Sequence, residues 1–306
     1  MTQSTWPEEI YLLIGCTAVG KTEVGIQWAR QGGAEIISAD SMLVYRGMDI
    51  GTAKPDRGQR SAIPHHLIDV VEPSESFSLG RYLPLADAAI RDIHGRGKRV
   101  LVVGGTGLYL KAIATGIFDG PPADEDIRER LKARAHQMGA SALHDSLEQI
   151  DPVSAQRIHR NDLKRVIRAL EVYELTGCPI SSLQTQFDTP RRPFKVRWCG
   201  LHRSSDQLNR RINRRVIQMI EDGLIEETRA LLAHKRSMSS QARKALGYQQ
   251  IIGHLEGRFT LEDAIEEIKI ATRRFAKSQR TWFKSFTEVS WIDADSAHAH
   301  IPDWQN

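Results

Sequence analysis

The chain has 306 residues, enough for one large domain or two smaller ones with a substantial core. Its 42 Lys and Arg residues against 38 Asp and Glu residues give a net charge of +4, which indicates an anionic partner only where positive charge is concentrated. Three cysteines without C-x-x-C spacing argue against a disulfide framework and a thiolate zinc site. With no signal-peptide pattern and no apolar run of membrane-spanning length, we expect a cytoplasmic protein without a membrane segment.

The first predicted strand leads directly into a phosphate-binding loop. Residues 10–14 are apolar, and residues 15–22 read GCTAVGKT, which fits G-x-x-x-x-G-K-[ST] at every required position. In such a loop backbone N–H groups form a nest for anions, the lysine adds positive charge, and the last hydroxyl binds a magnesium ion shared with the phosphates. A glycine turn that matches by accident is the alternative, but the amphipathic segment 24–30 supplies the helix that the motif requires. The predicted loop residues are Gly15, Cys16, Thr17, Ala18, Val19, Gly20, Lys21 and Thr22, with Thr22 as the Mg²⁺ ligand.

Strands and helices alternate from there to about residue 116. This alternation favours a parallel α/β sheet, in which ligands bind beyond the carboxyl ends of the strands. Asp40 follows the second strand, so we expect it to face the same crevice as the phosphate loop. The predicted elements are a strand at 34–38, an irregular loop at 42–55, a strand at 66–71, a helix at 79–94 and a strand at 99–105.

Beyond residue 116 the pattern becomes helical. Residues 124–142 and 151–175 have helical patterns, and no convincing strand occurs between 118 and about 193. The predicted fold is therefore a P-loop NTPase-like parallel α/β core with an inserted all-helical domain. The expected divisions are a first core part at 1–117, the helical insertion at 118–194 and a second core part at 195–306, which holds a return strand at 195–201, helices at 206–220, up to 232 and at 261–286, and an edge strand at 291–292.

Positive charge is concentrated in three segments. Residues 157–168 and 203–215 each contain five Lys or Arg residues and one acid, and residues 268–287 contain six with no acid. Such clusters are typical of proteins that bind a nucleic-acid backbone, although a charged run can also serve only to solvate a helix. Beside a phosphate loop they favour an RNA- or DNA-handling enzyme. A P-loop kinase of a nucleotide or small metabolite is the alternative, and an RNA-binding module without catalysis would leave the loop unexplained; no N-K-x-D element supports a regulatory GTPase.

Several motifs together resemble the bacterial tRNA dimethylallyltransferase family. They are GCTAVGKT at 15–22, DSMLVYRGMDIGTAKP at 40–55, GGTGLY at 104–109 and TRRFAKSQRTW at 272–282. The resemblance implies transfer of a dimethylallyl group from dimethylallyl diphosphate to the exocyclic N6 amine of the adenosine 3′-adjacent to the anticodon, in tRNAs reading codons that begin with U. It also implies Mg²⁺ and a helical insertion that grips the anticodon stem. We expect a monomer. Whether a related prenyl diphosphate can also serve as donor is left open by the sequence.

The resemblance assigns roles to individual residues. Asp40 matches the family's proposed general base, which a poorly nucleophilic adenine amine needs, although a strand-end carboxylate could instead only cap a turn or orient a magnesium-bound water. Thr17 and Arg215 are implied to act with the loop on the departing diphosphate, and Arg211 is the main rival of Arg215. Core packing would explain Met42 and Leu43 equally well. The implied tRNA contacts are Asp40, Ser41, Met42, Leu43, Thr106, Arg128, Lys164, Arg165, Val166, Ile167, Arg168, Arg243, Lys244, Gly247 and Tyr248.

Cys16 stands where the family has proline. The loop binds phosphate through backbone amides, so we expect little loss of function from this change. Because those amides attract anions, we also expect a lowered pKa and raised reactivity for the thiol.

Overall fold

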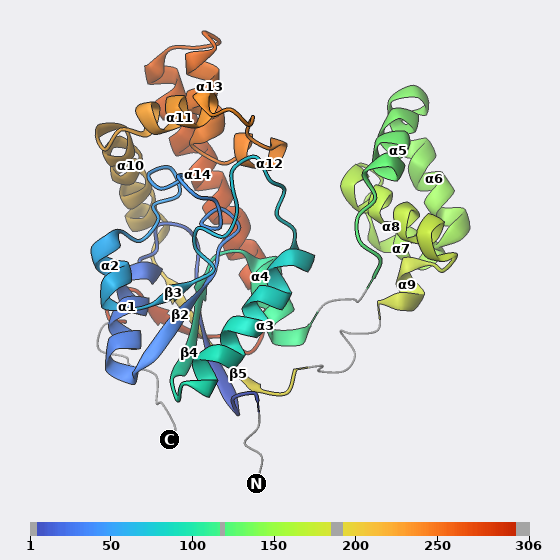
Figure 1. Cartoon of the computed structure of the whole chain (residues 1–306). Helices are drawn as coiled ribbons and strands as arrows, with labels where there is room; N and C mark the ends of the chain where they lie inside the picture. The colour runs from blue at the N-terminus through green and yellow to red at the C-terminus, as the bar shows by residue number, and fades with distance from the viewer. Residues whose placement is uncertain (1–4, 117–119, 185–191, 298–306) are drawn as a thin grey trace. The chain divides into compact units, whose positions relative to one another are not determined.

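The computed structural model describes residues 5–116, 120–184 and 192–297 (Figure 1). The chain divides into two compact units, one formed by Met1–Ala114 with Pro193–Asn306 and the other by Thr115–Arg192. The first holds the sheet and is called the core unit here, and the second is the helical unit. The predicted domain boundary between residues 117 and 118 lies outside the described residues.

The core unit is built on a parallel sheet in the order β3-β2-β4-β1-β5-β6. Its central strands are buried on both faces, which explains their continuous apolar sequences. The predicted parallel α/β core is thereby confirmed, including the return strand β5 and the edge strand β6. The strands are β1 (Glu9–Ile14), β2 (Ala34–Ala39), β3 (His65–His66), β4 (Arg99–Gly104), β5 (Lys195–His202) and β6 (Ser290–Asp293).

The strand predicted at 66–71 is wrong in length, because β3 ends at His66. Leu67 and Asp69 have φ angles of 63° and 57°, in the left-handed region, so the chain cannot continue as an extended strand. Only Val71 returns to strand-like pairing, in an isolated bridge with Tyr45.

Helices cover both faces of the sheet. α1 (Lys21–Gly32) connects β1 to β2, and α3 (Leu79–Gly95) lies between β3 and β4 in the chain. The two crossovers run in opposite directions across the sheet, and right-handed connections therefore place α1 and α3 on opposite faces (Figure 1). α4 (Gly107–Thr115) follows β4 and was not predicted as a separate helix.

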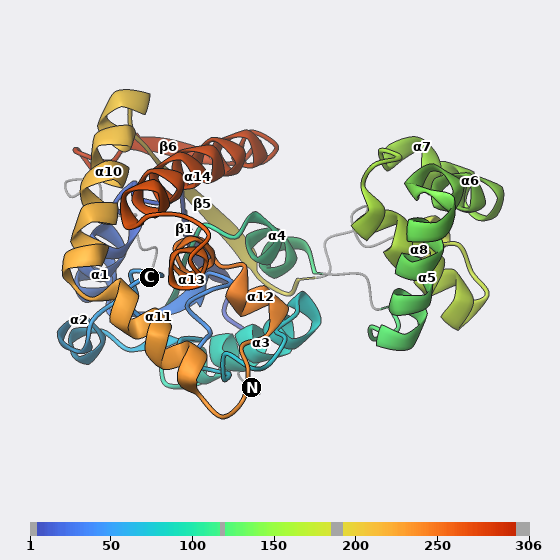
Figure 2. The same ribbon diagram turned by 90° about the horizontal axis from the view of Figure 1, so that it is seen from above.

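Most of the remaining helices of the core unit lie in its second part, after residue 193. The long helix α14 (Leu261–Phe283) packs against α10 (Ser205–Glu221) and α13 (Tyr248–Leu255), as Figure 2 shows from above. Its buried residues recur every three or four positions from Ala264 to Phe283, which gives the helix one buried face. Shorter helices are α2 (Arg57–Ala62), α11 (Leu224–Ala233) and α12 (Ser240–Arg243).

The helical unit contains helices and no strand among its described residues. Each of the two long helices predicted here is broken in two, the first at Gly139, whose φ is 88°. Leu143, Leu147, Val166 and Leu170 belong to its hydrophobic core. The helices are α5 (Glu125–Met138), α6 (Ala140–Ile150), α7 (Pro152–Arg157), α8 (Leu163–Thr176) and α9 (Ile180–Leu183).

Among the residues that the structure describes, no helix has the length and apolar character needed to cross a membrane.

Candidate active site

The register of the sheet brings the predicted site segments to one edge. Ile14 of β1 and Ala39 of β2 both pair with Gly104 of β4. The residues that follow these three strand ends are Gly15, Asp40 and Gly105, so the phosphate loop, the carboxylate and the glycine-rich turn all leave the sheet at the same level.

The segment between β1 and α1 has the conformation of an anion nest. Gly20 caps the helix with φ 113°, and Ala18 has φ 62°, so left-handed residues alternate with others along the turn. Lys21 folds back over the loop, with Nζ donating to the carbonyl oxygen of Cys16 at 2.9 Å. Burial lowers the pKa of Lys21 to about 8, with Asp40 opposing the shift and Arg215 adding to it.

Two arginines hold the loop from outside by its carbonyl groups. Arg211 Nε donates to Ala18 O and Arg203 Nε donates to Val19 O, each at 2.9 Å. The C=O and the following N–H of a planar peptide point in opposite directions, so the contact of Arg203 turns the Gly20 N–H toward the other side of the loop. The role of Arg203 was not predicted beyond its place in a basic segment, because the contact joins residues 184 positions apart.

Gln279 of α14 connects the phosphate loop to the turn after β4. Its Oε1 accepts a hydrogen bond from Thr17 N, and its Nε2 donates to Gly105 O, both at 2.8 Å. The side chain is 8% exposed. The sequence placed Gln279 in a motif of the family but gave no reason to select it from its neighbours.

One carboxylate oxygen of Asp40 accepts hydrogen bonds from the loop that follows it. Oδ1 accepts from Met42 N at 2.8 Å and from Leu43 N at 3.4 Å, a turn in which the carboxylate caps the backbone. Oδ2 accepts no hydrogen bond within the described part of the chain. Asp40 therefore has the turn-capping role that was one alternative, and it also keeps one oxygen available to a substrate.

Thr106 and Ser41 join the ends of β2 and β4 beside Asp40. Thr106 N donates to Ala39 O at 3.1 Å, and Ser41 N donates to Thr106 Oγ1 at 3.0 Å. Both side chains are partly exposed, as are Met42 and Leu43. These four predicted tRNA-contacting residues are brought together with Asp40 at one place on the core unit.

Arg215 lies in the same region, on α10. Its Nη2 donates to Thr52 O at 3.3 Å, which ties it to the loop after Asp40. Burial lowers the pKa of Arg215, Asp40 opposes that change and Arg211 adds to it, so the two arginines and the carboxylate share one electrostatic environment. Arg211 contacts the phosphate loop itself, whereas Arg215 donates to Thr52 O, in the loop after Asp40.

A carboxylate that the sequence did not reveal organises the loop 48–52. Glu227 of α11 accepts from the backbone N–H groups of Asp49, Ile50 and Gly51 at 3.0, 2.9 and 3.3 Å. The Tyr248 hydroxyl donates to the same carboxylate at 2.6 Å. Tyr248 was predicted to contact tRNA, but its side chain is fully buried, so that prediction is corrected for Tyr248. Gly247 is buried as well, and its predicted contact stays a prediction.

The prediction for Cys16 is wrong. Burial raises the pKa of the Cys16 thiol, and the nearby charges of Lys21 and Arg280 only partly oppose it. The side chain is 4% exposed, so a thiol reagent has little access to it. A thiol with a raised pKa and little exposure is a poor nucleophile.

Most of the other predicted tRNA contacts belong to segments that do not follow the ends of β1, β2 or β4. In the helical unit, Arg128 and Arg168 both contact the buried Glu171, with N···O distances of 2.9 and 2.6 Å. Lys164 and Arg165 are exposed. Val166 is fully buried and Ile167 is 5% exposed, so these two belong to the core of the unit and not to an RNA surface.

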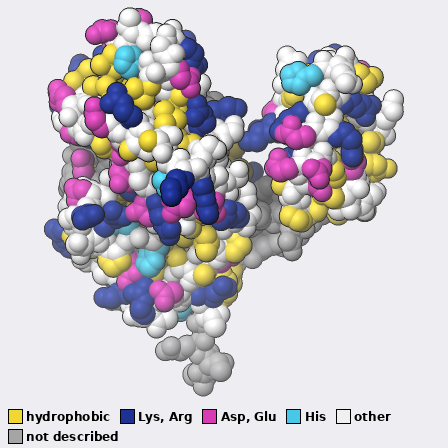
Figure 3. Space-filling model, turned by 45° about the horizontal axis from the view of Figure 1, so that its top comes forward, with side chains coloured by type: hydrophobic (Ala, Val, Ile, Leu, Met, Phe, Trp, Pro, Cys, Tyr) yellow, Lys and Arg dark blue, Asp and Glu magenta, His cyan; other side chains and the backbone are white. Residues whose placement is uncertain are grey.

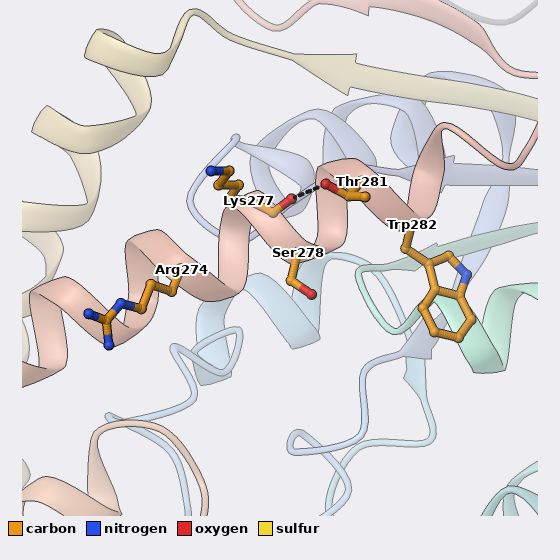
Figure 4. Close-up of a pocket in the computed structure, with 5 residues that line it drawn as sticks. All are labelled: Arg274, Lys277, Ser278, Thr281 and Trp282. Atoms are coloured by element: carbon orange, nitrogen blue, oxygen red, sulfur yellow. Dashed lines mark hydrogen bonds between the residues drawn. The ribbon is translucent and has the colours of Figure 1, made fainter. Parts of the chain in front are cut away.

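Arg243 is the last residue of α12 in the core unit, and Lys244 follows it. Arg243 pairs with Glu256 at 3.0 Å, and Lys244 is exposed. On the face in Figure 3 both units carry Lys and Arg side chains together with Asp and Glu side chains. The net charge is small because acidic groups offset many basic ones. One basic stripe lies on the outward side of α14, around a groove of about 430 Å³ lined by Arg274, Lys277, Ser278, Thr281 and Trp282 (Figure 4).

A metal ion would depend on Thr22 and on bound phosphate. The described residues contain no cluster of three or more His, Cys, Asp or Glu side chains that could hold a metal. Thr22 lies in the first turn of α1, is partly exposed, and its hydroxyl makes no hydrogen bond within the described ranges. One free hydroxyl beside a phosphate nest fits a Mg²⁺ ion that takes most of its ligands from phosphates and water.

Comparison with known proteins decides the family. The profile described as IPP transferase matches residues 43–286, and the isopentenyl transferase profile matches residues 8–62. The chain belongs to the IPP transferase family. The resemblance inferred from the motifs is thereby confirmed, and a P-loop kinase is not favoured.

Relatives in the IPP transferase family match over nearly the whole chain. The tRNA dimethylallyltransferases of Syntrophobacter fumaroxidans and Geobacillus kaustophilus are each 46% identical over 95% of this chain, covering 85% and 92% of those proteins. The solved structure of the full-length tRNA isopentenylpyrophosphate transferase from Bacillus halodurans has a TM-score of 0.69 at 44% identity, covering 94% of this chain and 90% of that one. A eukaryotic dimethylallyltransferase acting on tRNA has a TM-score of 0.81 at 29% identity, with coverage of 94% and 74%.

Proposed function

We propose that this protein transfers a dimethylallyl group from dimethylallyl diphosphate to the N6 amine of the adenosine 3′-adjacent to the anticodon, in tRNAs reading codons that begin with U. The observation that carries the proposal is the meeting of a phosphate nest and Asp40 at one sheet edge, in a chain of the IPP transferase family. The nest suits the diphosphate, and the carboxylate suits a proton that must leave the amine.

The donor half of the reaction breaks the bond between the allylic carbon and the diphosphate oxygen. Negative charge then builds up on the diphosphate, and fixed donors directed at such charge are usually the largest contribution to catalysis. The loop amides and Lys21 are those donors, and Thr17 is the side chain that the motif adds. The arginines at 211 and 215 add positive charge, with Arg215 held by Thr52 O at 3.3 Å.

The acceptor half forms the new carbon–nitrogen bond and releases one proton from N6. Asp40 Oδ2 accepts that proton, while Oδ1 stays bonded to Met42 N and keeps the carboxylate in place. A general base of this kind contributes about 10²–10⁴-fold to the rate. Mg²⁺, held by the Thr22 hydroxyl and the phosphates, would supply further charge neutralisation of the leaving diphosphate.

The target base must leave its stack before its amine can reach Asp40, so the anticodon loop is read with the adenosine turned out. Ser41, Met42, Leu43 and Thr106 surround Asp40 and suit contact with that base. The helical unit offers Arg128, Lys164, Arg165 and Arg168 to the phosphates of the anticodon stem, and Arg243 and Lys244 add charge on the core unit. The protein acts as a cytoplasmic monomer.

One assay tests the proposal. The protein is incubated with Mg²⁺, dimethylallyl diphosphate and unmodified tRNA, and the tRNA is digested and searched by mass spectrometry for dimethylallyl adenosine. The Asp40→Asn variant keeps an oxygen for Met42 N but cannot take the proton, so its kcat should fall about 10²–10⁴-fold. ATP turnover without an adduct would support the kinase instead, and an undiminished rate in the variant would remove Asp40 from the mechanism. Repeating the assay with a longer prenyl diphosphate measures the choice of donor.

A further inference from the structure

The carboxamide oxygen of Gln279 accepts a hydrogen bond from a backbone N–H group of the phosphate loop. Thr17 N–H, which belongs to the loop, donates to Gln279 Oε1 at 2.8 Å, and Gln279 Nε2 donates to Gly105 O at the same distance. A backbone N–H can only donate and a carbonyl can only accept, so these two partners fix which end of the carboxamide faces the loop. The oxygen end is the end directed at the phosphate loop.

This carboxamide and the Lys21 ammonium approach the same glycine. A Cβ built on Gly105 would lie 2.6 Å from Gln279 Nε2 and 3.5 Å from Lys21 Nζ. The lysine of a phosphate loop reaches the outer phosphates of a bound chain. Gln279 therefore lies beside the place that the outermost phosphate of a longer chain would have to enter.

We propose that Gln279 limits this loop to two phosphates, which makes it a specificity-determining residue for diphosphates against triphosphates. The inference rests on the proposed function and deepens it, because dimethylallyl diphosphate carries two phosphates where ATP carries three. A third phosphate would meet the partially negative Oε1 and would find the Thr17 N–H already bonded. The side chain is 8% exposed and bonded at both ends, so it cannot turn aside without losing Gly105 O as well.

A purely structural tie between α14 and the loop would behave differently. If Gln279 only held the loop in shape, its removal would weaken binding of short and long phosphate chains by the same factor. If it excludes the third phosphate, its removal changes the ratio of the two affinities. The ratio is therefore the quantity to measure.

Isothermal titration calorimetry on the full chain, at one fixed free Mg²⁺ concentration, gives the Kd of pyrophosphate and of tripolyphosphate. We expect the wild type to bind pyrophosphate at least about tenfold more tightly than tripolyphosphate, and Gln279→Ala to remove most of that preference. Ser278→Ala is the matched control, since Ser278 precedes Gln279 on α14 but lies on the exposed groove face (Figure 4). It should keep the wild-type ratio.

Gln279→Glu supplies a second arm that does not depend on the alanine variant folding. The carboxylate can still accept from Thr17 N but brings a negative charge to the entry of the third phosphate, so tripolyphosphate should weaken more than pyrophosphate and the ratio should widen. The proposal is overturned if the wild type binds pyrophosphate and tripolyphosphate equally tightly. It is also overturned if the ratio of the two Kd values is unchanged in both variants. Binding of these inorganic anions does not require tRNA. The calorimetric result can therefore be interpreted even if the prenylation assay fails.

Discussion

The Tyr248 hydroxyl donates to Glu227 Oε1 at 2.6 Å, and the same carboxylate accepts backbone N–H groups from the loop 48–52. Burial raises the pKa of Tyr248, and Glu227 raises it further, so the hydroxyl remains a donor throughout the physiological range. That loop ends in Thr52, whose carbonyl holds Arg215. A chain of contacts therefore connects α11 and α13 to an arginine beside Asp40, although none of these helices belongs to the phosphate-loop motif.

Replacing Glu227 should damage both the reaction and the fold. Glu227→Ala leaves three N–H groups and a hydroxyl without their acceptor, so the loop and Arg215 shift, and we expect kcat/KM for prenylation to fall about 10–100-fold. Tyr248→Phe removes only one hydrogen bond to a charged group, a loss of about 1.5–3 kcal/mol in the free energy of unfolding with kcat/KM nearly unchanged. Steady-state kinetics and denaturant unfolding of both variants separate the two effects. Wild-type kcat/KM in Glu227→Ala would show that the loop does not position Arg215.

Gly51 must remain a glycine because Tyr248 packs against it. A Cβ at Gly51 would lie 2.5 Å from the Tyr248 ring, closer than any ordinary contact, and forcing a methyl group into a packed site costs about 1–3 kcal/mol. Gly95→Ala is the control, since a Cβ there meets nothing within 4 Å and alanine favours helix in the last turn of α3. Urea unfolding should show Gly51→Ala destabilised and Gly95→Ala unchanged or slightly more stable. Equal stability of the two variants would contradict the packing argument.

What could be predicted from the sequence was local. The phosphate loop, β1, β2, β4 and the helix after the loop follow from apolar runs and glycine spacing within about 25 residues, and the structure contains each of them. Asp40 could be placed because the end of a parallel strand has a known relation to a ligand crevice. Glu227, Gln279 and Arg203 could not be selected, because each acts through a partner more than 170 positions away, and the residues next to them in the sequence do not reveal that contact.

The errors have the same origin. A family motif assigned Val166 and Ile167 to RNA by position, but the turn of α8 directs both into the core while Lys164 and Arg165 remain outside. Cys16 was placed among anion-attracting amides, yet its side chain is buried, and burial raises its pKa. In both cases the prediction rested on the position along the backbone, and the burial of the side chain decided the outcome.

The charge of Lys21 should set the alkaline limit of donor binding. Its pKa is lowered to about 8, chiefly by burial, so the free protein carries the positive charge below that pH and loses it as the pH rises. We expect kcat/KM for dimethylallyl diphosphate to decline through pH 8, approaching about tenfold per pH unit above it, because kcat/KM reports ionisations of the free enzyme. Lys21→Arg should lower activity but remove this decline, since arginine stays charged. A decline at the same pH in the variant would mean that another group titrates.

The stability of the helical unit should depend on the buried carboxylate of Glu171. Glu171 has no exposed side-chain surface and accepts from Arg128, Arg168 and Asp124 N. Burial raises the pKa of Glu171, but its hydrogen bonds to Arg168, Asp124 N and Arg128 outweigh burial and leave it lowered from 4.5. Glu171→Gln keeps the shape and removes the charge, and breaking a buried ion pair costs up to about 3–5 kcal/mol, less here because both arginines are partly exposed.

The pH dependence of that loss distinguishes charge from packing. A carboxylate whose pKa is lower in the folded state stabilises fully above its unfolded value, and the stabilisation disappears as the pH falls through the folded pKa. The difference in unfolding free energy between wild type and Glu171→Gln should therefore be constant from pH 5 to 8 and shrink below about pH 4. Glu174→Gln, on the same helix, is the control, because its pairing with Arg130 is a surface ion pair that contributes about 0–1 kcal/mol. A Glu171→Gln defect that persists unchanged into acid would assign the loss to packing.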